Sequence, residues 1–219
     1  MGTNSTKIKS SEAYTSLGLV GSDEIYPQII SIMASVLEKS VQKNEKLSKS
    51  LRRKESVTVF HGLRAPTLSI RQYIERIHRY ANCSPSCFVI AFVYMDRYAQ
   101  RTDSHLTSLN VHRLLITSVM LAAKFVDDAC YSNAYFAKVG GVSTAEINEL
   151  EMEFLSTLDF RLHVTVEEFD QYCLRLERDA SGSFQIQQAV GACGRKGSWP
   201  ITDEPRSSPE ISGYTCRAI

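Results

Sequence analysis

Three charged residues stand where the hydrophobic pattern calls for apolar ones, and their position makes them the strongest candidates for chemistry in this sequence. Lys124 lies in residues 110–128, a run that is apolar nearly all the way round a helix. Asp96 ends another apolar run, and Glu151 falls inside the apolar arc of a further helix. A charge that leaves water without a partner is costly, so each needs an opposite charge, a hydrogen bond or another protein.

The charge in the 110–128 helix belongs to a stripe. At about 100° per residue, Arg113, Thr117 and Lys124 fall on one narrow side of that helix. This side must face solvent, buried partners or a second protein. For Lys124, simpler interpretations also stay open: a cation is favoured near a helix C-terminus, its stem can follow apolar surface, and Asp128 is within reach.

The two acidic residues raise the same question. Glu151 either reaches water from the fringe of its apolar arc or pairs with a cation. For Asp96, which follows the apolar run that begins at Cys87, we expect a partner on another helix. Arg113 is the first candidate and Arg76 the second. The Asp96–Arg113 pair would be structural, a buried charge cluster with no catalytic role.

Motifs for enzymatic chemistry are missing from the sequence. It contains no G-x-G-x-x-G, H-E-x-x-H or G-x-S-x-G, and residues 191–198 have the wrong spacing for a phosphate loop. Cys83 and Cys87 lack the second pair that a zinc site requires, and the histidines are scattered. We therefore expect no catalytic residues, no cofactor and no metal.

Composition limits the class of partner. With 219 residues, 43% of them apolar, and a net charge of +1, the chain can bury a core and has no overall electrostatic attraction to nucleic acid or membrane. No window reaches the roughly 18 apolar residues of a membrane span, and the N-terminus lacks a secretory signal. The six cysteines are expected to be free thiols of an intracellular protein of the nucleus, the cytoplasm or both.

The chain divides by pattern into five parts. We expect a flexible leader at 1–22, a helix and basic segment at 23–56, a helical core at 57–162, a further helix at 163–178 and a disordered tail at 179–219. The basic run between residues 43 and 54 is either a solvated helix end or a nuclear-localisation patch. The tail is set apart by five of the eleven glycines and the only tryptophan.

Helix-start signals recur through the core, and no segment alternates as a strand does. Capping boxes begin at Ser69, Ser143 and Thr165, and Ser84-Pro85 is typical of a helix start. Gly140-Gly141 predicts the end of a short helix. The fold class is therefore all-α, a compact bundle with two central helices surrounded by amphipathic ones.

Several long motifs together resemble the cyclin box. They are Val93-Tyr-Met-Asp-Arg-Tyr98, Leu121-Ala-Ala-Lys-Phe125 and Leu150-Glu-Met-Glu-Phe-Leu-Ser-Thr-Leu-Asp-Phe160. The stretches Val59–Leu63, Tyr80–Phe88 and Asn110–Val119 resemble the plant U-type (P-type) cyclins, which are similar to the phosphate-regulon cyclin of yeast. The resemblance covers about residues 24–175.

This resemblance implies a five-helix cyclin-box fold, here with an N-terminal flanking helix and a short C-terminal helix. It also implies a non-catalytic subunit that binds and activates a cyclin-dependent protein kinase as a heterodimer, in cell-cycle or phosphate- and nutrient-linked control. By motif, the kinase-binding lysine and glutamate fall on Lys124 and Glu151, and the aspartate of the buried charged cluster falls on Asp96.

The sequence also departs from the larger cyclins. There is room for only one helix after Phe160, so the second five-helix repeat is missing. Residues 68–72 replace the Met-Arg-Ala-Ile-Leu stretch that many cyclins use to dock substrates. The sequence therefore gives no support for substrate docking through that stretch. Because cyclin-box folds also occur in transcription factors, an adaptor that binds a transcription or signalling complex without activating a kinase is the alternative.

Overall fold

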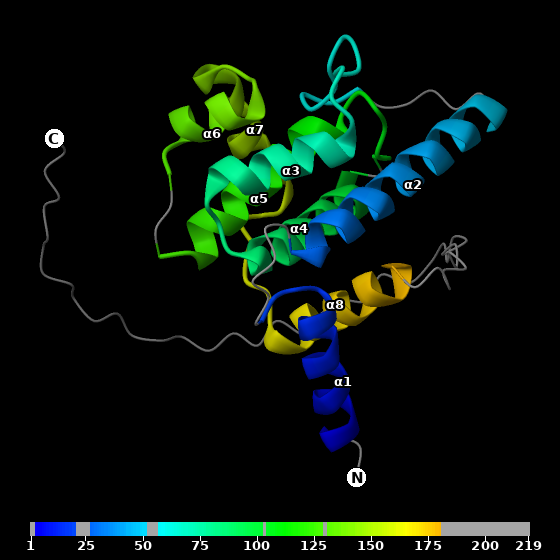
Figure 1. Cartoon of the computed structure of the whole chain (residues 1–219). Helices are drawn as coiled ribbons and strands as arrows, with labels where there is room; N and C mark the ends of the chain where they lie inside the picture. The colour runs from blue at the N-terminus through cyan, green and yellow to red at the C-terminus, as the bar shows by residue number, and fades with distance from the viewer. Residues whose placement is uncertain (1–2, 21–26, 52–56, 103, 129–130, 181–219) are drawn as a thin grey trace, which may run out of the picture. The chain divides into compact units, whose positions relative to one another are not determined.

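The described residues of the computed structural model, 3–20, 27–51, 57–102, 104–128 and 131–180, form helices and no strand (Figure 1). This confirms the predicted all-α class. Five helices lie between residues 57 and 162 and one follows them, as predicted, but two helices precede them in the described residues instead of the single flanking helix expected. The bounds are α1 (Thr3–Ser16), α2 (Gln28–Leu51), α3 (Ile70–Ala81), α4 (Pro85–Thr102), α5 (Val111–Val126), α6 (Asn133–Gly140), α7 (Thr144–Thr157) and α8 (Val166–Ala180).

Helix α5 is the centre of the bundle. It packs against α3, α4, α6 and α7, and all its residues are buried except Arg113 and the last three, 124–126. The polar stripe is therefore not a continuous solvent edge. Thr117, in its middle, is fully buried and donates its hydroxyl to the Arg113 carbonyl at 2.8 Å. Only the two charged ends of the stripe emerge from the core.

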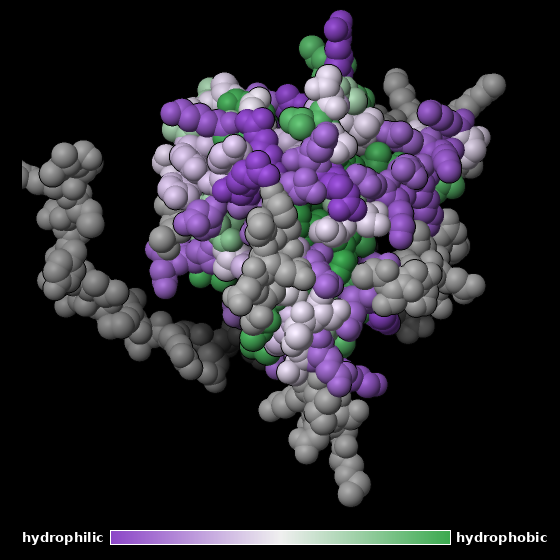
Figure 2. All heavy atoms as spheres, in the orientation of Figure 1, coloured by the Kyte–Doolittle hydropathy of each residue, from purple (hydrophilic) through white to green (hydrophobic). Residues whose placement is uncertain are grey.

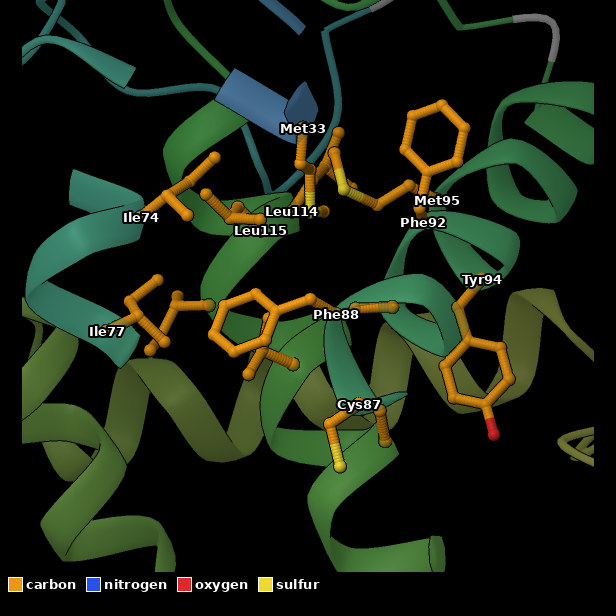
Figure 3. Packing of buried hydrophobic residues seen from close by; sticks show 14 of the residues in the cluster. Met33, Ile74, Ile77, Cys87, Phe88, Phe92, Tyr94, Met95, Leu114 and Leu115 are labelled. Atoms are coloured by element: carbon orange, nitrogen blue, oxygen red, sulfur yellow. The ribbon is translucent and has the colours of Figure 1, made fainter. Parts of the chain in front are cut away.

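The core joins side chains from four helices. Met33 of α2 and Ile74 of α3 lie close to Leu114 and Leu115 of α5, and Phe88 of α4 extends toward Ile77 (Figure 3). These side chains come from four different helices and pack closely together, so the position of each helix limits the positions of the others.

The helix starts agree with the predicted capping signals, with an informative difference. The box at Ser69 is complete, with Gln72 returning to the Ser69 amide. At α7, Ser143 accepts from the Glu146 amide, and at α8, Thr165 accepts from the Glu168 amide. In both of these helices the glutamate side chain pairs with an arginine of another helix instead of closing the box.

The start of α4 is tied to the end of α5. Ser84 gives both its amide and its hydroxyl to the Asp127 carboxylate, at 3.0 and 2.8 Å. A carboxylate is stabilised near a helix N-terminus by the partial positive charge there. The predicted helix start at Pro85 is confirmed, and the serine hydroxyl joins two helix ends.

The N-terminal residues correct the prediction of a flexible leader. Residues 3–16 form α1, which contacts α8. Ala13 and Leu17 are fully buried, and the Tyr14 ring packs against Phe169 with centroids 5.9 Å apart. The Tyr14 hydroxyl donates to Asp170. The sequence of α1 has almost no helical hydrophobic periodicity, so its contacts with α8 could not be read from the pattern.

Other boundaries shift modestly. The helix expected from about residue 23 begins at Gln28, directly after Pro27, and α8 continues to Ala180. The disordered-tail prediction concerns mainly residues 181–219, which lie outside the described residues, as does the end of the basic run at 52–54.

The described residues bear on two predictions from composition. Cys83, Cys87 and Cys173 are free and buried, and the other three cysteines lie outside the described residues. No helix in the described part of the chain has the length and apolar character to span a membrane. Polar residues dominate the face seen in Figure 2, with apolar residues between them.

We predict that α1 is a structural part of the bundle. Leu17 directly follows α1, and its amide donates to the Ala13 carbonyl of that helix. Replacing the fully buried Leu17 with alanine should lower the free energy of unfolding by about 2–4 kcal/mol, because the change leaves a cavity. The exposed Thr15→Ala on the same segment should change it by less than about 0.5 kcal/mol. Chemical denaturation measures both. Equal stability of the two variants would contradict a packed α1.

Candidate protein-binding site

Two of the residues singled out by pattern meet at the end of α5. Lys124 Nζ lies 2.6 Å from Glu151 Oε1 of α7, and the side chains are 31% and 15% exposed, respectively. Glu151 therefore does not simply reach water from the fringe of its arc, and Lys124 pairs with Glu151 rather than with Asp128. The pair is formed within the chain, at the boundary between core and solvent.

A third helix holds the glutamate in place. Asn133, at the start of α6, donates to Glu151 Oε2 at 2.6 Å and to Asn148 Oδ1 at 2.7 Å. Both Glu151 oxygens thus have a partner on a different helix, which limits the carboxylate to one orientation. Elements α5, α6 and α7 together position the site.

The charged pair retains bonding capacity. The Lys124 ammonium has three donors, and one partner is observed for it among the described residues. Each Glu151 oxygen accepts one hydrogen bond here and has a second lone pair. The pair can therefore bond an approaching protein without first being broken.

Exposed apolar side chains adjoin the pair. Phe125 and Val126 follow Lys124 at the end of α5, and Met152 follows Glu151 on α7 with 58% of its surface exposed. We call Lys124, Phe125, Val126, Glu151 and Met152 the α5–α7 surface. Aromatic residues and methionine are enriched where proteins bind one another, and charges contribute orientation. The surface has the composition of a protein interface.

The predicted pair of Asp96 with Arg113 is wrong, and so is the second candidate, Arg76. Asp96 Oδ2 accepts from Arg175 at 3.3 Å and from the Tyr172 hydroxyl at 2.6 Å, both on α8. Burial and this bond to the carboxylate raise the pKa of the Tyr172 hydroxyl. Arg76 instead donates to the Lys138 carbonyl. The Asp96 side chain is 27% exposed, so its cluster is half-buried.

Arg113 points to the start of α7. Its Nε lies 2.7 Å from Glu146 Oε1. A Cβ on Gly62 would lie 2.5 Å from Arg113 Nη1, so the missing side chain there makes room for the guanidinium. The predictions failed because they sought partners only among α3, α4 and α5, and the docking of α7 and α8 decides both pairs.

Sequence reasoning missed several members of these sites. Asn133 carries no periodic signal, because it opens a short helix. The sequence pattern places Glu146 in a capping box, although its position in the first turn of a helix also suits a pair with another helix. Among the described residues, no three His, Cys, Asp or Glu side chains gather to hold a metal. The expectation of no cofactor and no metal stays a prediction.

Comparison with known proteins gives consistent matches. The family profile described as Cyclin matches residues 23–162. Cyclin-P3-1 of Oryza sativa subsp. japonica is 54% identical over 176 residues, covering 78% of this chain and 75% of the relative. Cyclin-U4-1 of Arabidopsis thaliana is 50% identical over 156 residues, with 71% and 77% covered. Cyclin-U3-1 of Arabidopsis thaliana is 44% identical over 203 residues, with 91% and 87% covered. These similarities confirm the resemblance drawn from the motifs.

A double-mutant cycle tests the corrected pairing. Arg113→Ala and Glu146→Ala should show a coupling energy of about 0.5–1 kcal/mol, because the pair is in contact yet about one-third exposed. Arg113→Ala and Asp96→Ala should be additive within about 0.5 kcal/mol. Both cycles are measured by chemical denaturation. Coupling in the second cycle and none in the first would contradict the contact between Arg113 and Glu146 and would support one between Arg113 and Asp96.

Proposed function

The chain belongs to the cyclin family, and on that premise we propose that it binds a cyclin-dependent protein kinase and activates it, with no active site of its own. The pair of Lys124 and Glu151 carries the proposal. These residues occupy the motif positions of the family's kinase-binding lysine and glutamate, and they are joined at 2.6 Å beside exposed apolar residues.

The energetics of the pair favour a binding role. A partly exposed ion pair contributes little to stability, with a median near 0–1 kcal/mol. Its value to an interface is larger, because the charges are already oriented and lose little freedom on binding. Facing a kinase, Lys124 would donate to backbone carbonyls and Glu151 would accept from backbone amides as charge-assisted hydrogen bonds.

The apolar members of the α5–α7 surface would supply the area that the charges lack. Phe125, Val126 and Met152 are exposed here and would be buried in the complex. A stable complex buries roughly 1,600 Å² in total, so neighbouring residues must also take part. The charged pair would fix the register of this contact.

Activation would follow as a population shift. A kinase alone samples arrangements in which its C helix is turned outward and its lysine–glutamate pair is broken. A cyclin that binds the inward arrangement more tightly raises the population of that arrangement by the ratio of the two affinities. The kinase residues then perform phosphoryl transfer, in cell-cycle or nutrient-linked control.

We predict that both charges are needed for kinase binding. Lys124→Ala and Glu151→Ala should each weaken the affinity for a partner kinase at least about tenfold, since each removes charge-assisted bonds from the interface. Calorimetry or co-purification with a panel of cyclin-dependent kinases measures this. The exposed Lys138→Ala and Glu149→Ala on neighbouring helices are matched controls and should bind normally.

A charge exchange separates an interface role from a structural one. The double variant Lys124→Glu with Glu151→Lys keeps opposite charges in contact, and Asn133 can turn its amide to suit either partner. The fold should survive, as judged by thermal unfolding, while kinase binding stays lost. If the exchange restores kinase binding, the pair matters only for the fold.

A kinase assay decides between activation and the adaptor alternative. Adding the purified chain to a kinase that it binds should raise phosphate transfer to a protein substrate many-fold, and the Lys124→Ala variant should not. Tight binding without a rise in phosphate transfer would favour the adaptor.

A further inference from the structure

A cavity lined by cationic side chains lies at the junction of α4, the end of α7 and the segment before α8. Its volume is about 390 Å³, and the residues that line it are Arg97, Gln100, Arg101, Leu158, Arg161 and His163. We propose that this cavity binds the phosphate group of a phosphorylated serine or threonine in a peptide segment of another protein.

Two arginines of α4 hold the backbone of the cavity wall. Arg97 donates to the carbonyls of Arg161 and His163, each at 3.0 Å. Arg101 donates to the Thr157 carbonyl at 3.0 Å. The wall is therefore fixed at both ends by guanidinium groups, and its shape does not depend on a ligand.

The segment after α7 presents its polar side chains in alternation. Residues 161, 163 and 165 are exposed, while Leu162 and Val164 pack against the core. Side chains of an extended segment alternate between two sides, so Arg161 and His163 share the outer side. Neither side chain forms a hydrogen bond or ion pair within the described residues, and both line the cavity. They remain available to a ligand.

The charge balance of the cavity favours an anion. Arg97 is paired with Glu168 and Arg101 with Asp159, which offsets two of the three arginine charges. The guanidinium of Arg161 forms no ion pair in the described part of the chain, although the Asp159 carboxylate is near enough to interact with it electrostatically. Neither carboxylate lines the cavity. The polar side chains that line it are three arginines, His163 and Gln100, whose amide nitrogen donates to Asp96, and Leu158 is the apolar member.

A phosphate monoester fits this donor set better than a carboxylate does. It carries nearly two negative charges and three acceptor oxygens in a tetrahedral arrangement. Arginines approaching from α4 and from the 161–163 segment can each bond a different oxygen. Clusters of this kind are a general mode of phosphopeptide recognition.

The turn beside the cavity points to a peptide rather than a free ion. Asp159 and Phe160 are consecutive residues with φ of 50° and 57°, a left-handed conformation that is costly for an aromatic residue. The result is that Phe160 is 62% exposed next to Arg161. An exposed ring adjoining a phosphate site can contact the residues that flank a phosphorylated side chain.

The cavity can be tested without a kinase. Leu158 directly follows α7 and lies about two helical turns, roughly 10 Å, beyond Glu151, so the two sites use different residues. The experiment uses the full chain labelled with ¹⁵N. Three probes are titrated: a degenerate peptide library with a fixed phosphothreonine, the same library with threonine, and inorganic phosphate.

We expect the phosphothreonine library to shift the amide resonances of residues 97–101 and 157–163, and the threonine library to leave them unchanged. Inorganic phosphate should bind at least about tenfold more weakly, because it lacks the contacts to Phe160. Arg161→Glu should weaken the phosphopeptide affinity at least about tenfold. Arg71→Glu, on an exposed arginine of α3, should change it less than about twofold.

The variants are expected to fold, since the Arg161 side chain is exposed and forms no hydrogen bond or ion pair with the described residues. Thermal unfolding checks this. His163→Ala provides a second variant, which should also weaken phosphopeptide binding. Equal binding of inorganic phosphate and phosphopeptide would overturn the peptide assignment. Shifts that are the same for both libraries, or that persist in Arg161→Glu, would overturn the site itself. The Lys124→Ala variant should bind the phosphopeptide normally, so failure of the kinase proposal would leave this result unchanged.

Discussion

The burial of α5 is the constraint on which the rest of the structure depends. A helix that is apolar nearly all the way round must be surrounded, and here α3, α4, α6 and α7 surround it. Covering the middle of the helix leaves only its ends to carry charge. Arg113 at one end pairs with Glu146, and Lys124 at the other pairs with Glu151, so both ends of α5 are tied to α7. The candidate binding surface is thus a consequence of how the core closes.

Much of this could be predicted from local pattern. Helical spacing and capping residues gave the all-α class and the order of the core helices, because these signals act within a few residues. The conflict between charge and apolar arc singled out Lys124 and Glu151 before any contact was known. The partner of Asp96 could not be predicted, because it lies on α8 and depends on how distant elements dock. The packing of α1 could not be predicted either, because its apolar residues do not recur at helical spacing.

Two glutamates in capping positions show what local sequence spacing cannot predict. Glu146 and Glu168 each stand where a capping box is expected, and each forms an ion pair with an arginine of another helix. A charge-assisted pair between two helices competes with a local bond to one amide. Sequence spacing describes only the capping bond within one helix, so it cannot predict whether the ion pair with another helix forms instead. The pair of Glu168 with Arg97 also shapes the wall of the cationic cavity, which links α8 docking to that site.

The central claim is that the α5–α7 surface meets a kinase. Amide hydrogen exchange of the chain, alone and with a bound cyclin-dependent kinase, tests it most directly, because it locates the contact without altering a residue. The account predicts slower exchange at the end of α5, around residues 123–127, and along α7 at 148–153, with little change in α1. Protection confined to the loop at 57–68 or to α8, with unchanged exchange at both predicted segments, would contradict it.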